Sequence, residues 1–252
     1  MIGVFDSGSG GLTVLRTIRE RLPSADIVYF GDIKNAPYGS KPHDELFALT
    51  LESIDFLKAR GATRIVSACN SISTALAMSL ADVRSVTLFD FIEMVGPTVS
   101  AFKKSDARIL LCATPATVRS KMYRHVFQMI GKNIHQVAIR DLAGAIENGA
   151  PVGEIEQMIA EAFAEIDHRE YNTLILACTH YPLVADSFRR VLGDIDLFDP
   201  AEAVAHRVER EWQSQETGNG ATQFFITQES ESFRARVASL FPRYADRIEV
   251  VE

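Results

Sequence analysis

Cysteine, long apolar runs and positive charge are all scarce in this sequence. Three cysteines, an odd number in a chain of 252 residues, do not make a disulfide framework, so we expect free thiols in a reducing compartment. No apolar run approaches the roughly 20 residues that a membrane-spanning helix needs, and the chain enters a strand at once without a signal segment. We therefore expect a cytoplasmic protein that does not bind membranes.

The charge balance limits the choice of partner. The net charge is -7 and the pI is about 5.4, which argues against nucleic acid, because its phosphates are held mainly by clustered Lys and Arg. An anionic ligand would have to be bound by local donors rather than by the field of the whole protein. The hydrophobic fraction of 47% and the charged fraction of 23% are those of a globular protein.

Apolar runs alternate with helical patterns along the chain, which predicts an α/β fold with mainly parallel sheets. The predicted strands are Gly3–Phe5, Ile27–Phe30, Ser85–Phe89, Arg108–Cys112, His135–Ile139, Thr173–Ala177, Gln223–Thr227 and Ile248–Val251. The predicted helices are Leu12–Ile18, Asp44–Arg60, Ser71–Leu80, Val95–Lys103, Val152–His168, Leu183–Leu192, Ala201–Trp212 and Glu229–Leu240.

A second unit is expected to begin near Pro97, and the last elements are expected to return to the first unit, since the strand counts are otherwise unequal. This predicts one domain of residues 1–96 and 204–252 and another of residues 97–203. Loops or turns are expected at 31–39, at 197–200 and, as a mobile surface loop, at 213–222. Residues 114–120 are expected to form a loop that runs into a helix whose first turn holds Thr117 and Ser120.

Two cysteines follow apolar runs in matching contexts. Cys178 comes after Thr173–Ala177 and is followed by Thr179 and His180, while Cys69 ends a similar run and is followed by Asn70 and Ser71. Ligands bind at the carboxyl ends of the strands in open α/β sheets, so the pair predicts two half-sites facing one cleft. The alternative for each is a buried cysteine that acts as a small hydrophobe. Cys112 has no polar neighbour before Thr114, and we expect it to pack in the core.

A glycine-rich turn follows the first predicted strand. It reads Asp6-Ser7-Gly8-Ser9-Gly10-Gly11 and leads into the helix that starts at Leu12. Backbone N–H groups at such a helix start form an anion site for a phosphate or a carboxylate. The run matches neither the P-loop nor Gly-x-Gly-x-x-Gly, and a simple tight turn would explain the glycines but not the Asp6-Ser7 pair.

Two thiols on either side of a bound molecule fit an acid and a base that act on opposite faces of one carbon. The thiolate is the base and the thiol is the acid, and Asp6 near one sulfur and His180 near the other are suitable proton partners. No metal or other cofactor is required, and neither Cys178 with His180 nor the remaining histidines show the spacing of a zinc site.

Short polar side chains gather at the same predicted strand ends. They can hold carboxylates, while Asp6 can attract an ammonium group, so we expect a small-molecule substrate, an amino acid. The expected substrate-binding residues are Asp6, Ser7, Pro37, Tyr38, Gly39, Cys69, Asn70, Ser71, Thr114, Thr117, Cys178, Thr179 and His180.

These motifs resemble those of the glutamate racemase family, the cofactor-independent two-cysteine racemases. The resemblance runs through Phe5–Val14, Tyr29–Asp32, Pro37–Gly39, Ala68–Asn70, Ala113–Thr114 with Thr117 and Ser120, and Ala177–Leu183. It implies two similar α/β domains with the active site in the cleft between them, a homodimer, and interconversion of L- and D-glutamate, an acidic amino acid, for peptidoglycan synthesis. It also implies that Cys69 and Cys178 are the acid and base, assisted by Asp6, Glu147 and His180.

The chain also departs from the family pattern. The segments that differ are Ile33–Ala36, Ser71–Ser73, Leu88–Glu93 and Val137–Asp141. An aspartate or broad-specificity racemase is therefore the nearest alternative, and a non-catalytic protein that binds an amino acid is the alternative from another class.

Overall fold

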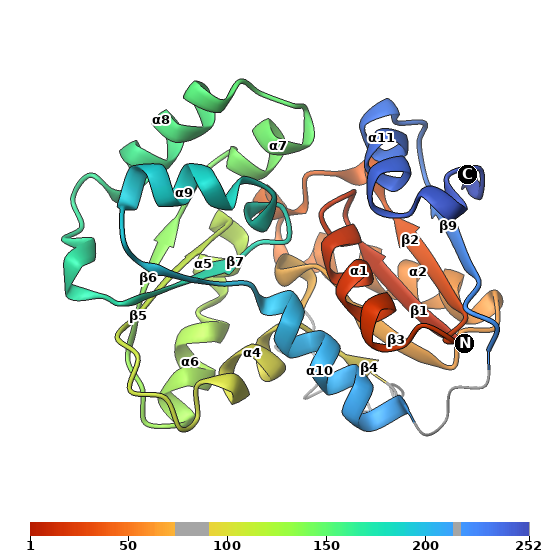
Figure 1. The fold of residues 1–252 in the computed structure, drawn as a ribbon, viewed down its shortest axis with the longest axis horizontal. Coiled ribbons are helices and arrows are strands. Elements are labelled where there is room, and N and C mark those ends of the chain that lie inside the picture. The colour runs from red at the N-terminus through yellow and green to blue at the C-terminus, as the bar shows by residue number, and fades with distance from the viewer. Residues whose placement is uncertain (74–90, 214–217, 252) are drawn as a thin grey trace.

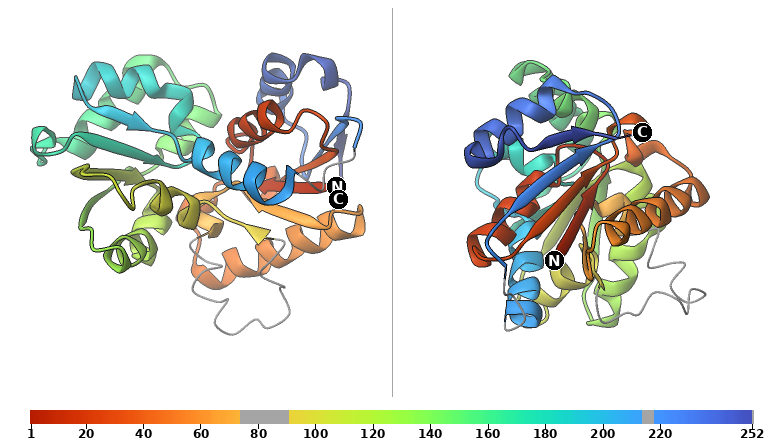
Figure 2. Two further views of the ribbon diagram at one scale, coloured as in Figure 1. Left: turned by 60° about the horizontal axis from the view of Figure 1, so that its bottom comes forward. Right: turned by 90° about the vertical axis from the view of Figure 1, so that its right-hand side faces the viewer.

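The computed structural model describes residues 1–73, 91–213 and 218–251. Two parallel sheets form two lobes that lie side by side (Figures 1 and 2). The first sheet has the order β10-β9-β2-β1-β3-β4, with β1 (Ile2–Asp6), β2 (Ile27–Gly31), β3 (Arg64–Ser67), β4 (Phe91–Ile92), β9 (Thr222–Ile226) and β10 (Ile248–Val250). The second has the order β6-β5-β7-β8, with β5 (Ile109–Ala113), β6 (Ile134–Ala138), β7 (Thr173–Ala177) and β8 (Asp196–Phe198). The predicted α/β fold with two similar parallel-sheet domains is confirmed.

Helices cover both faces of each sheet, which is why the central strands are apolar without alternation. All five residues of β1 are buried, with Ile2 and Val4 in one core and Phe5 in the core on the opposite face. The longer helices are α1 (Leu12–Arg21), α2 (His43–Ala59), α8 (Val152–Phe163), α9 (Ala185–Leu192), α10 (Pro200–Trp212) and α11 (Glu231–Leu240). The shorter ones are α4 (Val95–Ala101), α5 (Pro115–Ser120), α6 (Met122–Met129) and α7 (Leu142–Glu147).

The two sheets repeat one topology. Strands β2-β1-β3-β4 have the same order as β6-β5-β7-β8, so the chain reverses direction across the sheet between β1 and β3 and again between β5 and β7. Such switch points open a crevice at the carboxyl ends of the strands. Cys69 follows β3 and Cys178 follows β7, so each sulfur lies at a switch point of its own sheet.

Two local predictions need correction. The helix expected to hold Thr117 and Ser120 in its first turn is α5, but it begins already at Pro115, because Thr114 caps its start by accepting a hydrogen bond from the Thr117 N–H and Pro115 is tolerated in its first turn. Residues 196–198 form strand β8 rather than a turn, since they pair with β7.

Other predicted boundaries were inaccurate or fall outside the described residues. Helix α8 ends at Phe163, five residues before the predicted end at His168, and the predicted loop 31–39 contains 3-10 turns at Ile33–Asn35 and Tyr38–Ser40. Helix α7 was not predicted. The strand expected at 85–89, most of the helix expected at 71–80 and part of the loop expected at 213–222 lie outside the described residues, and Thr222 already belongs to β9.

Across residues 1–73, 91–213 and 218–251, no helix combines the length and the apolar character needed to cross a lipid bilayer.

Candidate active site

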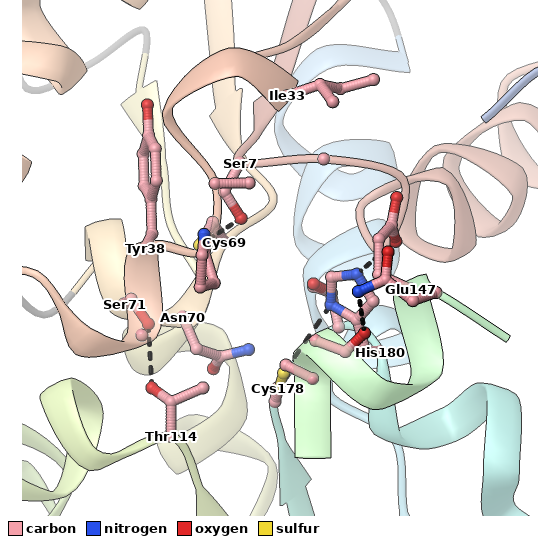
Figure 3. A pocket seen from close by; sticks show the side chains of 18 residues that line it. Ser7, Ile33, Tyr38, Cys69, Asn70, Ser71, Thr114, Glu147, Cys178 and His180 are labelled. Carbon is pink, nitrogen blue, oxygen red and sulfur yellow. Dashed lines mark hydrogen bonds and ion pairs between the residues drawn. The ribbon is translucent and has the colours of Figure 1, made fainter. Parts of the chain in front are cut away.

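A cavity of about 210 Å³ lies between the carboxyl ends of the two sheets (Figure 3). Both lobes supply its walls. Its lining residues are Ser7, Gly8, Ile33, Ala36, Pro37, Tyr38, Gly39, Cys69, Asn70, Ser71, Thr114, Ala143, Gly144, Glu147, Asn148, Cys178, Thr179 and His180. Every residue expected at the site lines this cavity except Asp6 and Thr117, which lie behind its wall.

Those two residues connect to the lining by hydrogen bonds. Asp6, the last residue of β1, accepts hydrogen bonds from the Gly8 N–H at 2.8 Å and from the Thr179 hydroxyl at 3.2 Å. The Thr117 hydroxyl lies 3.2 Å from that of Thr114 and 3.4 Å from that of Ser71. Both therefore hold lining residues in place across the two lobes.

The two sulfur atoms come from different lobes and face one cavity. Figure 3 shows Cys69 beside Ser7 and Asn70 on one wall and Cys178 beside His180 on another. Each cysteine is 6% exposed, so neither is sealed in a dry core. The Cys69 sulfur lies 3.9 Å from the Ser7 hydroxyl, and the Cys178 sulfur lies 3.9 Å from His180 Nδ1. By contrast, Cys112 is fully buried in the second lobe, as expected.

The surroundings of Cys69 favour a protonated thiol when the cavity holds no cation. Burial and the nearby Asp6 carboxylate raise the pKa of the Cys69 thiol to about 12. Backbone N–H groups of Ile72 and Ser71 point at the sulfur and lower its pKa in part. Those donors belong to the helical turn that starts at Asn70, so the same turn is suited to stabilising a thiolate.

His180 and Glu147 form a partly buried ion pair beside the other sulfur. His180 Nε2 lies 2.7 Å from Glu147 Oε2. Burial lowers the pKa of His180, but its contacts with the Cys178 sulfur and with Glu147 outweigh this effect and raise that pKa to about 10. Burial raises the pKa of Glu147, but its hydrogen bond and charge interaction with His180 outweigh it, and the net pKa is about 2. The pair therefore places a cation next to Cys178 at neutral pH.

Two further residues, Ser9 and Arg236, complete this network. The Ser9 hydroxyl donates to Glu147 Oε2 at 2.5 Å, and Arg236 Nη1 on α11 donates to the same oxygen at 3.2 Å. Arg236 also donates to the Ser9 hydroxyl. Asp6 is close enough to interact with both His180 and Glu147, and burial raises the pKa of its carboxyl.

Asn70 offers an unused donor to the cavity. Its Oδ1 accepts a hydrogen bond from the Tyr123 hydroxyl at 2.6 Å, whereas its buried Nδ2 has no hydrogen-bond partner among the described residues. A buried unsatisfied donor costs free energy. In Figure 3 this amide nitrogen points into the cavity, where a ligand carboxylate would satisfy it.

Glycine allows the two lobes to approach closely at the cavity. A Cβ at Gly10 would lie 2.5 Å from Thr179 Oγ1 and 2.6 Å from His180 Nδ1, and one at Gly39 would lie 2.7 Å from Thr114 Cβ. Both glycines are thus required by packing rather than by a positive φ.

Several residues at the site carry no recognisable signal in the sequence. Ile33, Ala36, Ala143, Gly144 and Asn148 line the cavity but carry no motif. Arg236 is 89 residues from Glu147 and lies in an ordinary amphipathic helix, so no spacing rule could have joined the two. In the described residues, no group of three or more His, Cys, Asp or Glu side chains could hold a metal ion.

Comparisons with known proteins agree with this geometry. A glutamate racemase of Aquifex pyrophilus is 39% identical over 206 residues, which is 81% of this chain and 80% of the relative. The glutamate racemase isoform RacE1 of Bacillus anthracis has a similar structure, with a TM-score of 0.88 and 29% identity over 100% of this chain and 97% of that one. The glutamate racemase of Francisella tularensis in complex with D-glutamate gives a TM-score of 0.87 and 26% identity over the same shares.

Residues 2–208 match the family of Asp/Glu/Hydantoin racemases. This match and the two thiols at equivalent strand ends confirm the resemblance: the chain belongs to the Asp/Glu racemase family.

Proposed function

We propose that this protein is a glutamate racemase that interconverts L- and D-glutamate without a cofactor. The observation that carries the proposal is the placement of Cys69 and Cys178 on different lobes at the walls of one small cavity. The glutamate racemases with similar sequences and structures support glutamate as the substrate. The D-glutamate formed would serve peptidoglycan synthesis, as is usual for this family.

Inversion follows from the two sulfur atoms. One cysteine, as thiolate, removes the α-proton of the bound amino acid, so a C–H bond breaks, an S–H bond forms and the electron pair stays on the α-carbon. The other cysteine, as thiol, donates its proton to the opposite face of that carbon. The reverse reaction exchanges the two roles, so one site handles both enantiomers.

Neighbouring groups prepare each sulfur for its role. We propose that Glu147 and His180 assist Cys178, because the His180 cation lies 3.9 Å from its sulfur and favours the thiolate. For Cys69 we propose Asp6, whose charge interacts with this sulfur, as the assisting group. The Asn70 amide, the hydroxyls of Ser7, Ser71, Thr114 and Thr179, and the loop of Pro37, Tyr38 and Gly39 would bind and enclose the substrate. Thr117 would act from behind the wall, by holding the hydroxyls of Ser71 and Thr114 in place.

Substitution of each thiol tests the mechanism. Cys69→Ala and Cys178→Ala should each lower the rate of racemisation of L- and D-glutamate by about 10²- to 10⁴-fold, which is the usual contribution of a general acid or base. Cys112→Ala is the matched control, since that thiol lies in the core away from the cavity. Circular dichroism would follow loss of optical activity, with aspartate assayed in parallel.

The outcomes separate the alternatives. Normal racemisation by both cavity variants would contradict the two-thiol mechanism. Turnover of aspartate in preference to glutamate would assign the protein to the aspartate racemases. Binding of an acidic amino acid with no turnover by the unmodified protein would indicate a non-catalytic binding protein.

Three further proposals concern the whole chain. The cysteines described are all free thiols, and a thiol mechanism requires them to stay reduced, which supports a cytoplasmic location. The family resemblance supports a homodimer, which sedimentation would test. The chain would divide into two domains, one of residues 1–96 and 204–252 and the other of residues 97–203. The position of β9 and β10 in the first sheet supports this division.

A further inference from the structure

The contact between Arg236 and Glu147 joins the two lobes beside the cavity. Arg236 lies on α11, which packs with the first lobe, while Glu147 is the last residue of α7 in the second lobe. Ser9, in the glycine-rich turn of the first lobe, donates to the same carboxylate oxygen. Two hydrogen-bond donors of the first lobe, Ser9 and Arg236, therefore bind one oxygen of the Glu147 carboxylate in the second lobe.

That oxygen also accepts the hydrogen bond from His180. Glu147 Oε2 accepts hydrogen bonds from Ser9, His180 and Arg236 at 2.5, 2.7 and 3.2 Å, while Oε1 is buried and has no hydrogen-bond partner in the part of the chain that the structure describes. Without Ser9 and Arg236, rotation of the carboxyl group would be limited mainly by the imidazole. With them, the oxygen that faces His180 is fixed.

Arg236 itself does not line the cavity. Its side chain and that of Glu147 are each 19% exposed, so their charges are only partly screened by water. Its guanidinium can donate to two acceptors in a fixed geometry, and here both acceptors, Ser9 and Glu147, belong to the chain rather than to a ligand.

We propose that Arg236 is a positioning residue for the Cys178 half of the reaction: together with Ser9 it fixes the Glu147 carboxylate across the cleft, and this carboxylate holds His180 against the Cys178 sulfur. The proposal rests on the proposed racemase function for its kinetic consequence, but the effect on the reactivity of Cys178 does not depend on turnover.

The expected changes follow from the chain of contacts. Without Arg236 the Glu147 carboxylate could turn away from His180, which would weaken the interaction between the two charges. The pKa of His180 would then fall, and a smaller fraction of the imidazole would be protonated at alkaline pH. Cys178 and Asp6 are the other titratable groups that face His180. The Cys178 thiolate would lose the adjacent cation, whereas the environment of Cys69 would not change.

The test compares Arg236→Met, Arg236→Lys and Ser9→Ala with the matched control Arg234→Met, on the same helix. Among the residues that the structure describes, the side chain of Arg234 pairs with Glu229 at the surface. We expect Arg236→Met to lower kcat by roughly 10-fold or more with less than about a 3-fold change in KM, because a misplaced assisting group impairs proton transfer rather than binding. The alkaline limb of its pH profile should move to lower pH, and Arg236→Lys should restore part of kcat.

Alkylation by iodoacetamide at pH 7 to 9, followed by peptide mass spectrometry, gives a readout separate from activity. Cys178 should be labelled several-fold more slowly in Arg236→Met and Ser9→Ala than in Arg234→Met, with the labelling rate of Cys69 unchanged. Equal slowing of both thiols, or kinetics like those of Arg234→Met, would overturn the proposal. If the unmodified protein racemised no acidic amino acid, the proposed function would fail, while selective slowing of Cys178 would still support the positioning role.

Discussion

A single methyl group at Gly10 should test the link between the packing of the lobes and the reaction. Gly10 lies in the turn between β1 and α1, against the second lobe. In Gly10→Ala the new Cβ would lie 2.5 Å from Thr179 Oγ1, 2.6 Å from His180 Nδ1 and 2.7 Å from His180 Cε1. His180 is only 7% exposed and contacts Cys178 and Glu147 on its two sides, so its ring has little room to move without losing one partner.

The size of the effect follows from these distances. An ordinary contact begins at 3.4 Å and the closest ring atom lies at 2.6 Å, so the ring or the turn must shift by about 0.8 Å. A misplacement of about 1 Å in a catalytic arrangement can cost ~10²-fold in rate, and overpacking of a filled interior costs about 1–3 kcal/mol. We therefore expect Gly10→Ala to lower kcat by roughly 10- to 100-fold and to destabilise the fold by about 1–3 kcal/mol.

The assay is racemisation of L-glutamate followed by circular dichroism, with urea unfolding of the same samples. Gly153→Ala is the matched control, because Gly153 lies in α8 and an added Cβ would have no atom of the other described residues within 4 Å. Alanine there should stabilise the helix by about 0.5–1 kcal/mol and leave kcat unchanged. If Gly10→Ala retained the kcat of the unmodified protein while folded, the inference that the position of His180 controls the Cys178 half of the reaction would be refuted.

Two other predictions concern the cavity wall and the response to pH. Asn70→Asp keeps an acceptor for the Tyr123 hydroxyl but removes the unpaired Nδ2 donor and adds a negative charge, so KM for glutamate should rise by at least ~10-fold; an unchanged KM in steady-state kinetics would show that Asn70 does not bind substrate. The pKa of Glu147 is lowered from 4.5 to about 2, so this carboxylate stabilises the fold above pH 4.5, and the stabilisation is lost as the pH falls towards 2. The pKa of His180 is raised from 6.5 to about 10, so the protonated imidazole stabilises the fold below pH 6.5, and this stabilisation is lost as the pH rises through 10. In urea unfolding, the free energy of unfolding of the unmodified protein should therefore exceed that of Glu147→Gln by the largest amount between pH 4.5 and 6.5. If this difference did not depend on pH, the assignment of Glu147 and His180 as an ion pair would be contradicted.

The sequence alone determined the fold class and most of the cavity wall. Strands that are buried on both faces must be apolar throughout, so runs such as Thr173–Ala177 identify parallel strands. The residue that follows such a strand lies at the carboxyl edge of its sheet, which is why Cys178, His180 and Asn70 could be placed at a site from local sequence. The same local signals failed at β8, where strand pairing outweighed the composition of the segment. At α5 they predicted a helix but placed its start too late, because the Thr114 cap begins the helix at Pro115.

Only the tertiary structure decided which groups meet at the cavity, both within the second lobe and across the cleft. Contact between Glu147 and His180 depends on the packing of α7 beside the end of β7, and contact between Glu147 and Arg236 depends on the return of the C-terminal segment to the first lobe. Arginine in an amphipathic helix has the same local pattern whether it faces solvent, as Arg234 does, or reaches a carboxylate of the other lobe. Local sequence sets which side chains a strand end presents, but the approach of two lobes depends on packing summed over the whole chain.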